Sequence, residues 1–260
     1  MKTIITCATF AILLTACGQQ ASEPVAPAEP EVSVYEAALT YPGRPEGDFE
    51  KDAGRQPDKV LEFFGVAAGE TVLDMFSGGG YYTEMLAHVV GASGHVTSHT
   101  NSVVLNFSGD EFNARLAGGR LANVDVLNAE NNELELDADR FDIAIMTLNY
   151  HDLYWVSKEY GWEKIDVEAF LAELHKSLKP GGTLGIVDHH AEAGAPRETG
   201  GTLHRIDPGV VLADLETAGF VLDGESDLLR NMEDDYNKSV FDPAVRGQTD
   251  RFVMRFKKPE

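Results

Sequence analysis

Two short segments of the 260-residue sequence gather side chains that can move protons or bind ions. The first is "NYHD", residues 149–152, which places His151 next to Asp152. The second is "DHHAEAG", which starts at Asp188 and is followed by "HRID" at residues 204–207. A histidine ring oriented by a carboxylate is a common general base, so we predict that His151 deprotonates a substrate while Asp152 orients the ring. The alternative is that His151 lines a pocket without taking part in chemistry.

The second segment also permits a metal site, because imidazole and carboxylate groups are ligands for divalent transition metals. The candidate ligands are Asp188, His189, His190, His204 and Asp207. Adjacent histidines on a strand point to opposite faces, so only one of His189 and His190 can join such a site. We therefore predict no metal, and we predict that His189, His204 and Asn149 contact a substrate instead.

Alternating apolar runs and helical patterns indicate the elements that position these side chains. Strands are predicted at 71–76, 95–99, 123–127, 141–147, 183–189, 220–225 and 251–257. Helices are predicted from Pro57 and at 81–90, 110–116, 167–178 and 208–218, and the segment 41–55 is predicted to be a loop. This alternation predicts an α/β fold with a mostly parallel sheet and helices on both faces. The last two strands lack a helix between them, which predicts an antiparallel last strand.

The two segments that carry the candidate catalytic and ligand residues, "NYHD" and "DHHAEAG", follow the fourth and fifth predicted strands. The carboxyl ends of parallel strands form the usual ligand crevice of such sheets, so both segments should meet there. A long connection at 227–249 leaves another strand at the same edge. We expect this connection to cover the crevice and Tyr236 to contact the substrate.

A third segment, "VLDMFSGGGYYTEMLA" at residues 72–87, joins a predicted strand to a helix through a glycine cluster. Glycines allow a ligand to approach the backbone closely, and a helix N-terminus favours a negative or polar group. By itself the pattern is shared by binders of nucleotides, flavins and other ligands.

Four segments in this order, "VLDMFSGGGYYTEMLA", "RFDIAIMTLNYHD", "LHKSLKPGGTLGIVDHH" and "LADLETAGF", resemble class I S-adenosylmethionine-dependent methyltransferases. They look closest to predicted exported bacterial methyltransferases, and the resemblance covers about residues 45–258. It implies a Rossmann-like sheet of seven strands and methyl transfer from S-adenosylmethionine to a small molecule or an envelope component.

The resemblance also implies which residues bind the cofactor. These are Asp74, Ser77, Gly78, Gly80, Thr100, Asn101 and Glu130. The sequence departs from the family pattern at two of the places concerned. Phe76 replaces the first glycine of the loop, and Thr100 stands where the family has an acid that grips the ribose hydroxyls. Losing a charged acceptor removes about 1.5–3 kcal/mol of hydrogen bonding.

The chain begins "MKTIITCATFAILLTACGQQ", a basic start followed by a short apolar run and small residues, as in secretory signals. Leu14 to Cys17 resembles the lipobox of bacterial lipoproteins, in which the cysteine is acylated. We expect a signal peptide at 1–16, lipidation of Cys17, a flexible tether at 17–34 and a methyltransferase-like domain at 35–260. The expected location is the cell envelope, facing the periplasm, and Gly18 favours the outer membrane.

The formal net charge of −22 repels nucleic acid, which excludes nucleic-acid substrates and leaves small molecules as the expected partners. Two other functions fit the same residues. One is a ligand-binding lipoprotein without catalytic activity that keeps the methyltransferase fold, favoured by the departures at Phe76 and Thr100. The other is a metal-dependent hydrolase that uses the histidine cluster.

Overall fold

The computed structural model describes residues 32–260. The predicted signal peptide, the lipidation site Cys17 and most of the predicted tether lie outside the described residues. The first helix, α1 (Val34–Leu39), begins at a capping box made by Ser33 and Glu36, one residue before the predicted domain start. None of the helices described for residues 32–260 combines the length and the apolar character that a membrane crossing requires.

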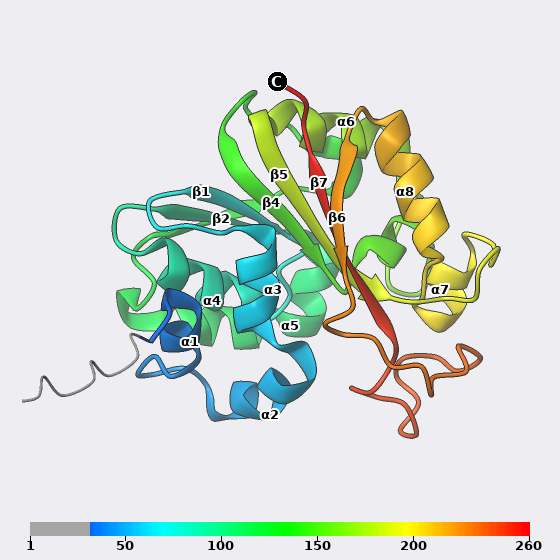
Figure 1. The fold of residues 1–260 in the computed structure, drawn as a ribbon, viewed down its shortest axis with the longest axis horizontal. Coiled ribbons are helices and arrows are strands. Elements are labelled where there is room, and N and C mark those ends of the chain that lie inside the picture. The colour runs from blue at the N-terminus through cyan, green and yellow to red at the C-terminus, as the bar shows by residue number, and fades with distance from the viewer. Residues whose placement is uncertain (1–31) are drawn as a thin grey trace, which may run out of the picture. The chain divides into compact units, whose positions relative to one another are not determined.

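A seven-stranded sheet forms the centre of residues 32–260 (Figure 1). Its strand order is β3-β2-β1-β4-β5-β7-β6. The strands are β1 (Thr71–Met75), β2 (His95–Thr100), β3 (Val124–Asn128), β4 (Phe141–Thr147), β5 (Leu178–His189), β6 (Val221–Ser226) and β7 (Arg251–Lys257). The strands from β3 to β5 in this order pair in parallel. The predicted Rossmann-like, mostly parallel sheet is therefore confirmed.

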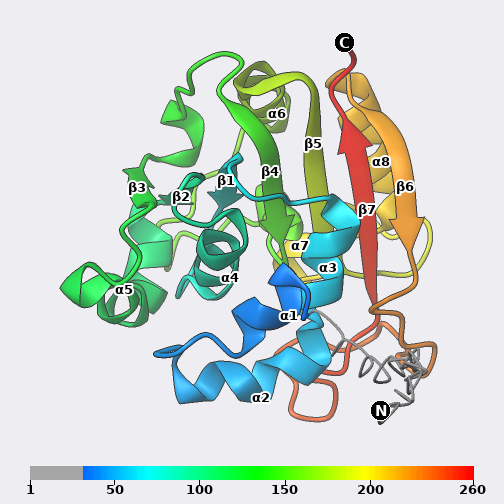
Figure 2. The ribbon, with the colours of Figure 1, turned by 60° about the vertical axis from the view of Figure 1, so that its left-hand side comes forward.

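The antiparallel last strand is also confirmed, and the structure shows where it inserts. β7 pairs antiparallel with β5 on one side and with β6 on the other. Figure 2 shows β7 lying between the two. Since two antiparallel pairings restore the original direction, β6 ends at the same edge of the sheet as β5, and the connection after β6 leaves from that edge.

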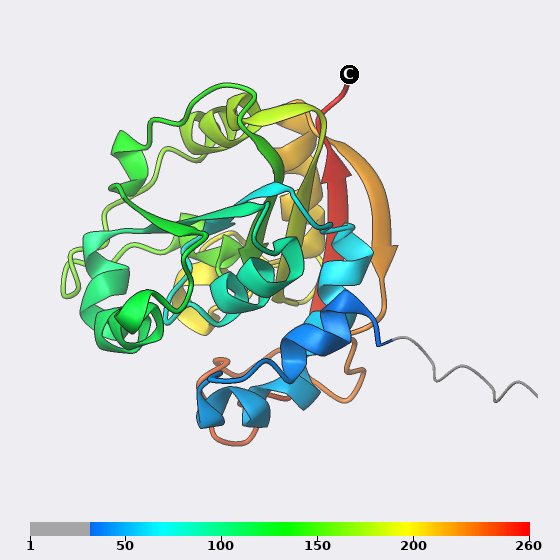
Figure 3. The same cartoon turned by 90° about the vertical axis from the view of Figure 1, so that its left-hand side faces the viewer.

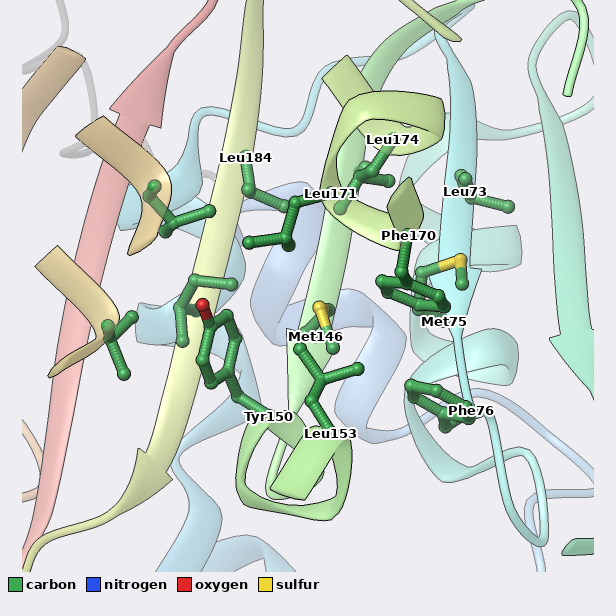
Figure 4. Close-up of a cluster of buried hydrophobic side chains, with 14 of the residues drawn as sticks. Leu73, Met75, Phe76, Met146, Tyr150, Leu153, Phe170, Leu171, Leu174 and Leu184 are labelled. Atoms are coloured by element: carbon green, nitrogen blue, oxygen red, sulfur yellow. The ribbon is translucent and has the colours of Figure 1, made fainter. Parts of the chain in front are cut away.

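Helices cover both faces of the sheet (Figures 2 and 3). One face carries α3 (Pro57–Phe64) and α4 (Tyr81–Val90), and the other carries α6 (Val167–Ser177) and α8 (Pro208–Thr217). Each face buries its own apolar cluster. In Figure 4, Phe170 and Leu174 of α6 pack toward Met75 and Met146 of the central strands. The continuous apolar pattern of these strands follows from burial on both faces.

The prediction of a loop at 41–55 is wrong, because α2 (Glu46–Arg55) occupies most of it. Two of its acids, Glu46 and Asp48, lie in the first turn and Arg55 lies in the last, as the helix dipole favours. Few apolar residues mark this helix, so hydrophobic periodicity does not reveal it. Ion pairs hold it instead: Arg44 binds Asp52, and Asp52 accepts a hydrogen bond of 2.6 Å from Tyr81 of α4.

Two other predicted bounds differ from the structure by more than one residue. Helix α5 (Ser102–Leu116) starts eight residues earlier than predicted, because the Asn101 side chain caps it by accepting from the Val104 N–H at 2.9 Å. Strand β5 begins at Leu178 rather than at Thr183. Leu178 pairs with Phe141, and Thr183 pairs with Ile143. The residues between Leu178 and Thr183, which the sequence suggested as a turn, form a shift of register within the pairing of β4 and β5.

Candidate active site

A cavity of about 760 Å³ opens at the carboxyl ends of the central strands. Its wall is built by the glycine loop after β1, the segment after β4, the end of β5, helices α2 and α5, and the connection after β6. This is the edge at which the sequence placed the site. The volume lies within the range of about 300–1,000 Å³ that is usual for small-molecule sites.

The glycine loop has a left-handed backbone at three positions, including Phe76, which replaces the first glycine of the family pattern. Phe76 has φ of 50°, Gly78 has φ of 58° and Gly80 has φ of 78°. A left-handed conformation costs a non-glycine residue about 1–2 kcal/mol. The Phe76 ring offsets this cost by packing against Phe170 and Trp162, with ring centroids 5.6 and 5.9 Å away. Phe76 therefore adopts the left-handed backbone of the loop and adds an aromatic wall to the cavity.

Asp74 lies behind this loop rather than on the cavity wall. Its carboxyl is buried and accepts one hydrogen bond of 2.6 Å from the Thr83 hydroxyl, while Oδ1 has no partner among the described residues. Burial raises the pKa of Asp74 to about 7, and the Thr83 hydrogen bond offsets only part of that effect. Asp74 thus fixes the end of β1 against α4, and the cofactor contact that the resemblance implies for it stays a prediction.

The raised pKa of Asp74 predicts a pH-dependent stability. An aspartate has a pKa of about 3.9 when unfolded, so ionisation favours the unfolded state and the free energy of unfolding falls as pH rises from about 4 to 7. Replacing Asp74 by Asn should remove this dependence. Between pH 5 and pH 8, we expect the free energy of unfolding of the wild type to fall by about 2–3 kcal/mol more than that of Asp74→Asn, as measured by denaturant titration. Parallel pH profiles of the two proteins would contradict the assignment.

Two residues on the cavity wall carry a polar group that lacks a hydrogen-bond or ion-pair partner among the described residues. Asn149 donates its amide N–H to the Met75 carbonyl at 2.9 Å, which leaves its buried Oδ1 unpaired within residues 32–260. Arg55 lies with its guanidinium 4.5 Å from the centroid of the Tyr81 ring, and no carboxylate of the described chain forms an ion pair with it. The residues that line the cavity therefore include one cation without a carboxylate partner, Arg55, and one buried acceptor without a hydrogen bond, Asn149 Oδ1.

Arg55 and its neighbour on the wall, Lys51, were not identified from the sequence because they belong to α2, the helix predicted as a loop. The charged spacing Asp48, Lys51, Asp52 and Arg55 is the signal that points to this helix. An amphipathic charge pattern alone does not say that the cationic side faces a cavity.

Opposite the glycine loop, His151 is held by Asp188. The Asp188 carboxylate accepts from the His151 ring Nδ1 at 2.8 Å and from the His151 backbone N–H at 2.7 Å. The ring Nε2 is left facing Asp152 Oδ1, 3.4 Å away, and His204 Nδ1, 3.3 Å away. The carboxylate that orients the ring is thus Asp188, whereas the sequence suggested Asp152. Asp152 follows β4, whereas Asp188 lies near the end of the neighbouring strand β5.

The two carboxylates control the charge of His151. Burial alone would lower the pKa of His151, but the charges of Asp188 and Asp152 outweigh burial and raise it to about 9. Burial lowers the pKa of the neighbouring His189 well below its usual value, and the positive charge of His151 adds to the effect. His189 is therefore neutral, and its Nδ1 lies 2.7 Å from the Thr249 hydroxyl.

Most of the residues predicted to act on a substrate line this cavity together. They are Asn149, His151, Asp152, His189 and His204, and Ser77 and Gly78 of the predicted cofactor set face them. The metal ligands considered from the sequence do not assemble. Of those five residues only His204 belongs to the compact group of ligand atoms found in residues 32–260, which consists of His151, Asp152 and His204.

Three residues aligned with the ribose and adenine contacts of the family lie away from this cavity. Thr100 is buried in β2. Asn101 uses its Oδ1 to cap α5 and donates from Nδ2 to Asn131, and Glu130 accepts from the Ser102 N–H at 3.1 Å. Asn101 and Glu130 line a second hollow of about 300 Å³, and Trp162 lines both hollows. Their cofactor contacts stay predictions.

The connection after β6 covers the cavity as expected, but through different residues. Tyr236 does not line the cavity: its hydroxyl donates to Asp250 at 2.8 Å and its ring stacks on His190. Val240 and Phe241 reach the wall instead. A buried ion pair between Arg205 and Asp234, 2.8 Å long, fixes the connection over the site.

Aromatic side chains dominate the rest of the wall. They are Phe76, Tyr81, Tyr82, Phe107, Trp155, Tyr160, Trp162 and Phe241. They come from five separate segments of the chain, and their spacing in the sequence gives no sign that they meet. Such a wall suits a flat or apolar ligand, with the polar groups of Asn149, His151 and Asp152 left to fix its orientation.

Curated relatives of this chain are quinone-pathway methyltransferases. The ubiquinone/menaquinone biosynthesis C-methyltransferase UbiE of Vibrio vulnificus is 28% identical over 130 residues, which are 50% of this chain and 45% of the relative. The corresponding protein of Vibrio campbellii is 27% identical over the same share of each chain. The chain thus spans about half the length of the curated relatives it matches.

Solved structures of S-adenosylmethionine-dependent methyltransferases have a fold similar to that of this chain. A SAM-dependent methyltransferase from Aquifex aeolicus superposes with a TM-score of 0.54 and 25% identity, over 78% of this chain and 89% of the other. An S-adenosylmethionine-dependent methyltransferase from Mesorhizobium loti gives a TM-score of 0.54 at 18% identity, over 79% and 99%, which supports the fold alone.

The model of the ubiE/COQ5 methyltransferase family matches residues 53–193. This stretch contains the glycine loop and both segments that meet at the cavity, the ones that carry Asn149 and Asp188. The match covers more than half of the chain and, with the similar structures, supports S-adenosylmethionine as the cofactor that the sequence predicted. The chain belongs to the ubiE/COQ5 methyltransferase family.

Proposed function

We propose that this protein transfers a methyl group from S-adenosylmethionine to a small molecule bound in the cavity. The observation that carries the proposal is the pairing of an unsatisfied acceptor, Asn149 Oδ1, with an unsatisfied cation, Arg55, beside the glycine loop. The methionine end of S-adenosylmethionine carries an ammonium, which can donate a hydrogen bond to an amide oxygen, and a carboxylate, which is opposite in charge to Arg55. When bound, the cofactor supplies an electrophilic methyl group on sulfur.

The residues of the chain divide the cavity into two ends. Ser77, Gly78 and Arg55 would hold the amino-acid end of the cofactor, while His151, Asp152 and His204 would contact the acceptor. Methyl transfer is an in-line displacement, so most of the work of these residues is to position the acceptor and exclude water. Asp188 keeps the imidazole ring of His151 fixed, and a proton lost by the acceptor would pass to the neighbouring Asp152 carboxylate.

The aromatic wall supports a flat, largely apolar acceptor rather than a sugar or a peptide. The curated relatives are named for ubiquinone and menaquinone biosynthesis, and a ring-bearing acceptor is compatible with the wall found here. The alternative of a binding protein without catalysis has no specific support in the cavity, since polar groups that can handle a proton lie next to the site.

We further propose that the protein works outside the cytoplasm. The supporting observation is the amino-terminal pattern that ends in Leu14-Thr15-Ala16-Cys17, with the tether that follows. Lipidation at Cys17 would anchor the domain in the cell envelope, facing the periplasm, with the outer membrane as the expected site. Mass spectrometry of the protein from a membrane fraction tests this, because an unmodified amino terminus at Met1 would contradict it.

The cofactor site is tested by calorimetry with two ligands that differ only at the amino-acid end. S-adenosylhomocysteine carries the ammonium and carboxylate, and methylthioadenosine lacks both. We expect Arg55→Met to weaken S-adenosylhomocysteine about 10–100-fold, as for the loss of a charge-assisted contact. The affinity for methylthioadenosine should be unchanged.

Arg140→Met, at an exposed position paired with Asp137 outside the cavity, is the matched control and should change neither affinity. Equal losses for both ligands in Arg55→Met would show that Arg55 acts elsewhere. Absence of binding of either ligand to the folded wild type would overturn the proposed function itself.

A further inference from the structure

Three ligand atoms converge at the acceptor end of the cavity. His151 Nε2 lies 3.4 Å from Asp152 Oδ1 and 3.3 Å from His204 Nδ1, and His204 Nδ1 lies 3.7 Å from Asp152 Oδ1. Ligand atoms bound tetrahedrally to Zn²⁺ at about 2.0–2.1 Å stand about 3.4 Å apart. The triangle found here therefore has nearly the size that a metal ion of this radius requires.

The hydrogen bond made by the other ring nitrogen of His151 is also one that is typical of metal sites. Metal-bound histidines usually donate their other ring nitrogen to a carboxylate or a carbonyl, which fixes the ring and its tautomer. Asp188 does this for His151, because its Oδ1 lies 2.8 Å from Nδ1. With one proton on Nδ1, a metal ion that displaces the Nε2 proton meets a lone pair directed toward the other two ligand atoms.

His204 reaches the triangle at a cost to its backbone. Its φ is 53°, in the left-handed region that few non-glycine residues adopt. The ring then lies edge-on against Phe241, with centroids 4.8 Å apart, and is tilted against Trp155, with centroids 5.8 Å apart. Strained residues of this kind concentrate at ligand sites, and here the strain brings Nδ1 toward His151.

We propose that His151, Asp152 and His204 bind a divalent transition metal ion, with Zn²⁺ as the ion that fits the triangle best. Two imidazoles and one carboxylate leave coordination positions open, as in catalytic rather than structural sites. All three residues line the cavity, so the open positions can take water or an oxygen atom of a ligand. A metal there occupies His151 Nε2 and the Asp152 carboxylate, so Asp152 then holds the ion instead of acting as a proton acceptor.

Metal binding does not depend on the methyl transfer proposed above, so the two are tested separately. The test is a calorimetric titration of Zn²⁺ into the full chain, purified without a histidine tag and stripped of metal by a chelator. We expect one ion per chain with micromolar or tighter affinity. Asp152→Asn and His204→Ala should each weaken binding by at least about 100-fold, and Asp188→Asn by about 10–100-fold.

His95→Ala is the matched control. His95 Nε2 lies 3.0 Å from Asp125 at a partly exposed site outside the cavity, so it also pairs an imidazole with a carboxylate. This substitution should leave the Zn²⁺ affinity unchanged. Circular dichroism of each variant identifies any that fails to fold, and Co²⁺ absorption of the wild type gives a second readout of the site.

Absence of Zn²⁺ binding to the folded wild type would overturn the metal site, and so would equal loss in His95→Ala. Neither result affects the binding of S-adenosylhomocysteine, which is measured without metal. Conversely, a protein that binds Zn²⁺ through His204 but neither S-adenosylhomocysteine nor methylthioadenosine would retain the metal site and lose the proposed methyl transfer.

Discussion

Replacing Gly78 by Val should reduce the affinity for S-adenosylmethionine at least about 100-fold, which corresponds to about 2.7 kcal/mol. Gly78 lies on the cavity wall with φ of 58°, and no atom lies within 4 Å of the place where a Cβ would stand. The added side chain would therefore project into open cavity rather than into protein. It would also strain the turn that brings the loop backbone toward the ligand.

Gly118 offers a control for the strain. It has φ of 72°, and the space around it is open as well, but it lies outside the cavity in the short helix Ala117–Gly119. Gly118→Val should lower the free energy of unfolding about as much as Gly78→Val, by at least about 1–2 kcal/mol, and leave ligand binding intact. Calorimetry and denaturant titration separate the two effects. Similar affinities of the two variants would show that Gly78 does not face the cofactor.

Removing Arg115 should have the largest effect on stability. Its buried guanidinium donates to Asp48 at 2.7 Å, to Glu84 at 2.6 Å and to the Gly79 carbonyl at 2.6 Å. Arg115→Met would leave two buried carboxylates with fewer partners, and such losses cost about 3–5 kcal/mol. Because the same side chain holds the glycine loop, the affinity for S-adenosylmethionine should fall too.

Arg140→Met serves as the control here as well. Arg140 forms an exposed ion pair with Asp137, so its replacement should lower the free energy of unfolding by less than about 1 kcal/mol. The double variant Arg115→Met with Asp48→Asn should recover part of the loss, because it removes one of the two charges left behind. Equal unfolding free energies for Arg115→Met and Arg140→Met in urea titrations would contradict this account.

The fold could be predicted from the sequence because burial leaves a strong periodic signal. Strand β4 was predicted at its observed bounds, since both of its faces are covered and its residues are nearly all apolar. Helix α2 was missed for the opposite reason. Its position is fixed by ion pairs such as Asp48 with Arg115, and these two residues lie 67 positions apart in the sequence.

The candidate site was predictable in its location but not in its detailed contacts. The segments around Asn149 and His189 follow neighbouring strands, so topology alone brings them together. The register of β5 against β4 and the directions of the side chains determine which carboxylate orients His151. In the structure this carboxylate is Asp188. Phe76 is similar: its type suggested an altered loop, yet packing against Phe170 lets it adopt a left-handed backbone.

The insertion of β7 between β5 and β6 bears on how the chain reaches its folded state. Thr183 of β5 pairs with Lys257 of β7, so this contact closes a long loop of chain, and contacts of that kind slow folding. Until β7 arrives, β5 exposes an unpaired edge and β6 has no neighbour, and such edges invite association with other chains. Synthesis through β6 therefore yields an incomplete sheet, and only the arrival of residues 251–257 completes it.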